Sequence, residues 1–261
     1  MKISVVVTTF NSPLFLAWVI ESILWQTKLP NQIVIADDGS DARTAGVVHT
    51  YREKSPIPIV HSYQPDNGFR LARSRNLATL KTTGRWIIFL DGDCVLPPNF
   101  ILRQSCIAKP GKLLFCARKL VTGPETQVLM KVSPSLEAVD KFFSGRKFRR
   151  VYLGFFRQFP ERTWRQARGF LMCVAREDIE RIQGFDENYH SWGLEDSDFV
   201  LRAQRSGVKL SDARYLVSLL HLNHEEPCGG AKSENWNQFK NLLSETFRTK
   251  PSHSIFSAME G

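Results

Sequence analysis

Long apolar runs and glycine-rich phosphate loops are both absent from this sequence of 261 residues. No stretch reaches the roughly 18 apolar residues that a membrane-spanning helix needs, so we do not expect an integral membrane protein. No G-x-G-x-x-G follows the first predicted strand, which argues against a standard dinucleotide-binding fold. No G-x-x-x-x-G-K-[ST] is present either, which argues against a P-loop.

Cysteine is scarce, and its spacing excludes the common paired motifs. The five cysteines include no C-x-x-C, and an odd number without an export signal favours reduced thiols in a cytoplasmic chain. The N-terminal apolar run is only about five residues long, which is typical of a first strand rather than a signal peptide. A hydrophobic content of 43% supports a sizeable core, and the length suits one large α/β domain.

Positive charge is abundant and is concentrated in one segment. The net charge is +9, and residues 140–168 hold nine Lys or Arg against Asp140 and Glu161, which gives 9 − 2 = +7 there. Aromatic residues alternate with these cations. The mixture is typical of a surface that binds an anionic membrane, nucleic acid or an acidic acceptor, and equally of a solvated basic face whose aromatics pack inward.

Strand and helix patterns alternate through the first 93 residues. The β-branched run "ISVVVTTF" (3–10) indicates a strand buried on both faces, and similar strands follow at 32–40, 57–64 and 85–93. Helical patterns separate them at 12–27, 41–53 and 68–83, the first with Ser12 as its N-cap and Pro13 at its first position. This alternation predicts a mostly parallel central sheet flanked by helices. Beyond it we expect a strand and short helix at 170–189, a helix at 194–210, and a tail from residue 225.

Three of the predicted strands end in polar side chains. Thr8 to Asn11, Asp37 to Ser40, and Asp91 to Asp93 all stand at carboxyl ends of strands. In open α/β sheets the ligand crevice lies outside those ends, so we expect these groups to meet at one site. Two carboxylates spaced D-x-D can hold Mg²⁺ or Mn²⁺ together with the phosphates of a ligand.

Four stretches of the first hundred residues resemble family 2 glycosyltransferases of the GT-A fold. They are "VVVTTFN" (5–11), "IVIADDGS" (33–40), "NGFRLARSRN" (67–76) and "WIIFLDGD" (86–93). The resemblance implies a donor-binding set, with the metal held by Asp93. That set comprises Thr8, Phe10, Asn11, Asp37, Asp38, Arg70, Arg73 and Asp91.

A second match lies in "SWGLEDSDFVLRAQRSGVKL" (191–210), which is similar to the C-terminal region of β-1,4-galactosyltransferase-like and chondroitin-polymerase-like enzymes. By this resemblance Trp192 packs against a sugar, Glu195 holds a sugar hydroxyl and Asp196 is the general base. Leu194 departs from the pattern, because many relatives have glycine there. The alternative for Asp196 is a purely structural role as the N-cap of a helix.

Two histidines complete the expected metal site. His221 and His224 are three residues apart, so a helical turn or a bent loop can place both rings on one side. The same relatives have a metal-binding histidine in this region, for which His224 is the first choice and His221 the second. Nitrogen ligands favour Mn²⁺ over Mg²⁺.

The sequence therefore predicts one GT-A domain with a nucleotide-sugar-binding half (1–105), an acceptor-binding and catalytic half (106–224) and a C-terminal tail (225–261). The expected activity is inverting, metal-dependent transfer of a hexose or N-acetylhexosamine, with galactose favoured, from a UDP-sugar to a glycan or glycolipid acceptor. Synthesis of lipopolysaccharide, capsule or another cell-surface polysaccharide fits this activity. We expect the protein in the cytoplasm, where residues 140–168 could also hold it on the inner face of the cell membrane. The alternatives are a nucleotidyltransferase and a non-catalytic module that binds glycan or nucleic acid.

Overall fold

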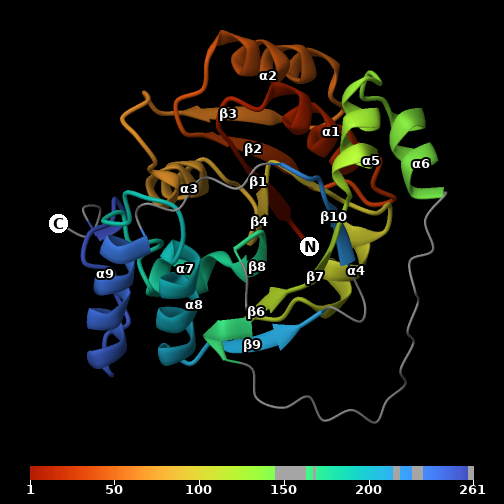
Figure 1. Ribbon diagram of the computed structural model, residues 1–261. Helices are drawn as coiled ribbons and strands as arrows, with labels where there is room; N and C mark the ends of the chain where they lie inside the picture. The colour runs from red at the N-terminus through yellow and green to blue at the C-terminus, as the bar shows by residue number, and fades with distance from the viewer. Residues whose placement is uncertain (145–162, 167–168, 214–217, 225–231, 258–261) are drawn as a thin grey trace.

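The computed structural model describes residues 1–144, 163–166, 169–213, 218–224 and 232–257 (Figure 1). A seven-stranded sheet with the order β3-β2-β1-β4-β8-β6-β9 runs through its centre. Its strands are β1 (Ile3–Thr9), β2 (Gln32–Asp37), β3 (Ile59–Tyr63), β4 (Trp86–Asp91), β6 (Lys112–Phe115), β8 (Leu171–Ala175) and β9 (Lys209–Asp212). All neighbours pair in parallel except β8, which is antiparallel to both β4 and β6. The predicted mostly parallel α/β sheet is confirmed.

Helices cover both faces of this sheet, which explains why its strands are continuously apolar. Along β1, Val5 and Val7 belong to one hydrophobic cluster and Val6 to the opposite one. On the first face lie α1 (Pro13–Leu24), α2 (Ala42–Lys54) and α4 (Phe100–Ile107), and on the second α3 (Leu71–Leu80), α7 (Arg176–Arg181) and α8 (Glu195–Arg205). A strand covered on both sides has no solvent face, so alternation of apolar and polar residues is lost.

The start of α1 differs from the expectation in one detail. Pro13 takes the first helical position as predicted, and Ser12 is the N-cap residue. Its side chain makes no capping bond, because the Ser12 hydroxyl donates instead to the carbonyl of Phe10 at 2.9 Å. The prediction of Ser12 as the N-cap residue is confirmed, although its side chain caps no backbone N–H.

A smaller sheet stands beside the carboxyl end of β4. It has the order β5-β10-β7, with β5 (Cys94–Val95), β10 (Ser218–His221) and β7 (Ala117–Leu120). His221 pairs with Cys94 across the antiparallel β5–β10 ladder, and this pairing brings the end of β10 next to Asp93. Helices α5 (Gly123–Met130) and α6 (Leu136–Ser144) flank this sheet, and share a hydrophobic cluster with Trp18 of α1.

The C-terminal part of the chain packs against α8. Helix α9 (Lys232–Ser244) lies beside α8 (Figure 1), and its Phe239 and Leu242 are buried in a cluster with Leu201 of α8. A short 3-10 turn, η1 (Trp164–Gln166), adds Trp164 to the same cluster. Among the described residues no helix is both long and apolar enough to cross a membrane. Most of the basic segment predicted at 140–168 lies outside the described residues.

Candidate active site

The turn after β4 carries Asp91 and Asp93 and requires the glycine between them. A Cβ added at Gly92 would lie 2.3 Å from the carbonyl oxygen of Thr8, closer than any side chain tolerates. The chain therefore passes directly over the end of β1. Thr8 also donates its hydroxyl to Asp91 at 3.3 Å, so the ends of the two strands are joined.

Asp93 meets both predicted histidines. Its Oδ2 lies 2.9 Å from Nε2 of His224 and 3.3 Å from Nε2 of His221. Burial alone would raise the pKa of Asp93, but the hydrogen bond from His224 and the charge of His221 hold that pKa below its usual value. Burial lowers the pKa of His221, which favours the neutral imidazole that binds metal.

This cluster fits a divalent transition ion. One carboxylate and two imidazoles converge, and carboxylate oxygen with imidazole nitrogen suits Mn²⁺. The thiol of Cys94 donates to Oδ1 of Asp93 at 3.2 Å, and the side-chain ligand atoms of Asp93, Cys94 and His221 all lie within 4.8 Å of one another. Asp93, His221 and His224, the three residues predicted to bind metal, are therefore brought together from the turn after β4 and from the end of β10 with the residues that follow it.

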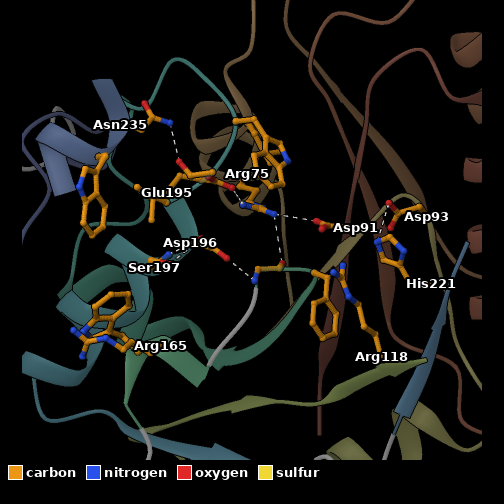
Figure 2. Close-up of a pocket in the computed structure, with 18 of the residues that line it drawn as sticks. Arg75, Asp91, Asp93, Arg118, Arg165, Glu195, Asp196, Ser197, His221 and Asn235 are labelled. Atoms are coloured by element: carbon orange, nitrogen blue, oxygen red, sulfur yellow. Dashed lines mark hydrogen bonds and ion pairs between the residues drawn. The ribbon is translucent and has the colours of Figure 1, made fainter. Parts of the chain in front are cut away.

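Arg75 occupies the centre of the site (Figure 2). Its guanidinium is fully buried and lies 3.0 Å from Oδ1 of Asp91 and 3.0 Å from Oε1 of Glu195. Burial raises the pKa of Asp91 to about 6, although the charge of Arg75 opposes this. Sequence reasoning assigned no role to Arg75, yet it joins the two halves of the site.

Glu195 keeps one oxygen available for a ligand. Burial, and then the charge of Asp196, raise its pKa to about 7. Within the described part of the chain its Oε2 is buried and has no hydrogen-bond partner. Because Glu195 lines the cavity described below, this oxygen can accept a hydrogen bond from a hydroxyl of a bound ligand.

The carboxylate of Asp196 is held by two backbone N–H groups, one just before β8 and one in α8. Gly169 donates its N–H to Oδ2 of Asp196 at 2.6 Å, and Ser197 donates its N–H to Oδ1 at 2.7 Å. Asp196 stands in the first turn of α8, whose N-cap residue is Leu194. Leu194 adopts φ = +76°, a left-handed conformation that favours glycine.

The other predicted donor-binding residues lie at the ends of β1 and β2. Asp37 is fully buried and pairs with His61 at 2.8 Å, while Asp38 accepts the backbone N–H of Arg70 at 2.8 Å. Burial raises the pKa of Asp38. Phe10 is 49% exposed, and Asn11 next to it adopts φ = +47°.

Neither Arg70, just before α3, nor Arg73 within it lines the cavity that contains Arg75. The Arg70 side chain donates to the carbonyl of Pro65, and Arg73 pairs with Glu187 at 2.9 Å. Arg75, from the same stretch, is the residue that lies between the carboxylates. Asp37 is likewise occupied by His61 and by the N–H of Ser40, so its contacts hold the loop after β2 in place.

One cavity of about 1090 Å³ connects Asp93 and its histidines with Arg75, Glu195 and Asp196. Its lining includes seven of the predicted site residues, namely Asp91, Asp93, Trp192, Glu195, Asp196, His221 and His224. Thr8, Phe10, Asn11, Asp37 and Asp38 lie outside that lining. At the far end of the cavity from Asp93 lie Arg165 and Asn235 (Figure 2), and Trp164, Trp192 and Trp236 also line the cavity.

Helix α9 helps to shape this far end. The side-chain amide of Asn235 donates to the carbonyls of Ser191 at 2.8 Å and Gly193 at 2.7 Å (Figure 2). These bonds fix the loop that carries Trp192 and leads into Glu195. The region expected to be a tail thus contributes directly to the walls of the cavity.

Family models match most of the chain. Residues 4–161 match "Glycosyl transferase family 2", and residues 149–225 match "N-terminal domain of galactosyltransferase". Validoxylamine A glucosyltransferase of Streptomyces hygroscopicus subsp. limoneus is 26% identical over 99% of this chain and 61% of its own length. Hyaluronan synthase of Pasteurella multocida is 24% identical over 95% of this chain and 27% of its own length. The chain therefore spans less than two thirds of these relatives.

Solved structures share the fold at low identity. TarS residues 1–349 of S. aureus, in complex with UDP-GlcNAc, superposes with a TM-score of 0.65 at 19% identity, covering 94% of this chain and 66% of that one. The mannosyltransferase PcManGT of Pyrobaculum calidifontis, in complex with GDP-Man and Mn²⁺, gives 0.61 at 18% identity, covering 95% and 67%. These matches confirm the predicted GT-A fold.

Proposed function

Since the chain belongs to glycosyl transferase family 2, we propose that it transfers a hexose or N-acetylhexosamine from a UDP-sugar to a glycan acceptor with inversion at the anomeric carbon. The observation that carries this proposal is the single cavity in which Asp93 with its two histidines, the Asp91–Arg75–Glu195 ion-pair chain and Asp196 face one another. A galactose-type sugar is favoured by the match of residues 149–225 to a galactosyltransferase domain.

Asp93, His221 and His224 would hold a Mn²⁺ or Mg²⁺ ion. When bound, such an ion supplies Lewis-acid stabilisation of the negative charge that develops on the departing diphosphate. The chain's own part at this end is to present a deprotonated carboxylate and a neutral imidazole, which the lowered pKa values of Asp93 and His221 favour.

Asp91, Arg75 and Glu195 would position the donor sugar. Arg75 is shared between two carboxylates, so each is kept in one orientation at the cavity wall. The unpartnered Oε2 of Glu195 would accept a hydrogen bond from a sugar hydroxyl. A sugar analogue without that hydroxyl would leave the oxygen buried and unpaired, which gives the site its selectivity.

Asp196 would act as the general base. An acceptor hydroxyl attacks the anomeric carbon, its oxygen forms the new bond, and the bond to the diphosphate breaks with the electron pair leaving on the phosphate oxygen. The proton released by the hydroxyl passes to the carboxylate of Asp196. A single displacement of this kind inverts the anomeric configuration, by analogy with inverting glycosidases.

The acceptor class and the location in the cell are also part of the proposal. We expect a glycan or glycolipid of a cell-surface polysaccharide, and relatives named as hyaluronan and chondroitin synthases support that class. Binding to an anionic membrane surface through 140–168 is proposed from the sequence alone, because most of that segment lies outside the described residues.

The decisive test combines ligand stabilisation with turnover. Thermal unfolding is measured with Mn²⁺ and UDP, GDP, dTDP or CMP, on the wild type and on Asp93→Asn. A ligand at ~100 times its Kd should add about 2.7 kcal/mol to the free energy of unfolding. We expect UDP to stabilise only with metal and only the wild type. Turnover of UDP-glucose, UDP-galactose and UDP-N-acetylglucosamine, with the product anomer assigned by NMR, then tests sugar and inversion. If no nucleotide stabilises a folded wild type, the binding-module alternative is favoured.

A further inference from the structure

The end of the cavity opposite the metal cluster combines aromatic rings with cations. We call the group Trp164, Arg165, Trp236, Phe239 and Lys240 the distal platform; Trp164, Arg165 and Trp236 line the cavity, while Phe239 is buried and Lys240 lies outside the lining. Phe239 is buried between the two tryptophans, with ring centroids 4.8 Å from Trp164 and 6.1 Å from Trp236. The platform is thus one continuous group of rings contributed by η1 and α9.

Each tryptophan of the platform carries a cation. The guanidinium carbon of Arg165 lies 4.5 Å from the ring centre of Trp164, and Nζ of Lys240 lies 5.6 Å from the ring centre of Trp236. A guanidinium stacked on a ring still presents the N–H groups of its edge, which match a carboxylate or phosphate in a bidentate way. Both cations are exposed, so these donors are accessible.

The carboxylates of the cavity do not neutralise Arg165. Asp91 and Glu195 share Arg75, Asp93 is engaged by the histidines, and Asp196 accepts the N–H of Gly169. Among the residues that the structure describes, none forms an ion pair with Arg165 or Lys240. Within the described part of the chain, neither charge is paired with a carboxylate; Arg165 lines the cavity, and Lys240 stands one helical turn after Trp236, outside the lining.

We propose that the distal platform binds a negatively charged unit of the acceptor, whose carboxylate or phosphate contacts Arg165 while its apolar face lies on Trp236 and Lys240 adds positive charge beside that ring. Trp236 is 41% exposed, and an exposed tryptophan in a cavity wall offers a large apolar area to a ligand. The unit would lie beyond the sugar that Asp196 activates. This inference rests on the proposed transfer reaction, because a molecule is an acceptor only if the protein transfers a sugar to it.

Binding of three defined probes tests the inference. The probes are a glucuronate-terminated disaccharide, the matched glucose-terminated disaccharide, and a phosphodiester-linked glycerol oligomer. Affinities are measured by calorimetry with and without Mn²⁺ and UDP. We expect at least one charged probe to bind about tenfold or more tightly than the neutral disaccharide, and the probe that does so tells carboxylate from phosphate.

Variants locate the effect on the platform. The double variant Arg165→Gln with Lys240→Gln should lose the preference for charge and keep the affinity for the neutral disaccharide. Trp236→Ala should weaken all probes. Arg85→Gln is the matched control, because Arg85 is an exposed arginine paired with Glu177 away from the cavity, and should change nothing. Thermal unfolding of each variant checks that it is folded.

The outcomes separate this inference from the proposed function. Equal affinity for charged and neutral probes, failure of every charged probe to bind, or a preference that survives the double variant would overturn the platform. If UDP with Mn²⁺ does not bind but the charged probe still does, the transfer reaction fails while the anion site stands.

Discussion

Replacing Gly169 by alanine should inactivate the protein without weakening donor binding. An alanine Cβ at this position would lie 2.7 Å from both Cβ and Oδ2 of Asp196. Ordinary contacts begin at 3.4 Å, so the carboxylate must retreat by 3.4 − 2.7 = 0.7 Å and its 2.6 Å hydrogen bond from the Gly169 N–H must lengthen. Misplacement of a reacting group by about 1 Å can cost ~10²-fold in rate.

We therefore expect kcat to fall about 100-fold, equivalent to ~2.7 kcal/mol in the activation free energy. The assay is turnover of the donor identified by the nucleotide test, with the Kd of UDP and Mn²⁺ measured in parallel. That Kd should stay within about twofold, because the hydrogen bonds of Gly169 in the described part of the chain go to Asp196 and Arg75 and not to Asp93 or its histidines. Gly46→Ala is the control: it lies in α2 with nothing within 4 Å of an added Cβ, and it should keep kcat and gain up to ~1 kcal/mol of stability. Wild-type kcat in Gly169→Ala, or equal loss of kcat and UDP binding, would refute the positioning of Asp196 by Gly169.

Three further predictions follow from buried contacts. Arg75→Met leaves Asp91 and Glu195 without their cation and should lower the free energy of unfolding, measured in urea, by about 3–5 kcal/mol. Arg85→Met removes an exposed ion pair and should lower it by only about 0–1 kcal/mol. Similar losses for the two variants would contradict the central role of Arg75. Asn235→Ala removes two hydrogen bonds to the Trp192 loop and should lower kcat/KM while the Kd of UDP stays unchanged, and a rise of that Kd would argue against the assignment. Because the folded-state pKa of Glu195 is about 7 against an ordinary 4.5, its contribution to stability is full below pH 4.5 and is lost as pH rises through 7. Metal-free wild type should therefore lose up to a few kcal/mol relative to Glu195→Gln between pH 5 and 8, and parallel pH curves for the two proteins would refute this.

Much of the fold was predictable because strands that are buried on both faces are continuously apolar in sequence. Strands β1, β2 and β4 are apolar runs that end in polar residues, and the sheet does place those ends together. His221 and His224 were proposed as metal ligands beside Asp93 from their spacing and the resemblance, and both rings do lie next to Asp93. The strands of the small sheet were not predicted, because runs of two to four residues carry no readable period.

Arg75 shows why part of the site was not predicted. Three arginines occur in "NGFRLARSRN", and nothing local distinguishes them, so Arg70 and Arg73 were chosen. The available signal was helical spacing: Arg75 stands three residues after Ala72 and four before Thr79, and both of these are buried. A charged residue on a buried stripe needs a partner, and its partner Glu195 is 120 residues away in the chain.

The position of β8 has a consequence for how the protein is made on the ribosome. Strand β4 ends at Asp91, but its outer neighbour β8 begins only at Leu171, which is 171 − 91 = 80 residues later. At 5–20 residues per second, the parallel part of the sheet waits roughly 4–16 s with the backbone of β4 unpaired on one side. An apolar strand edge left open in this way is a template for pairing with other nascent chains. A good yield of folded protein should therefore require rapid elongation through residues 92–170, or a chaperone that covers residues 86–90 until Leu171–Ala175 emerges.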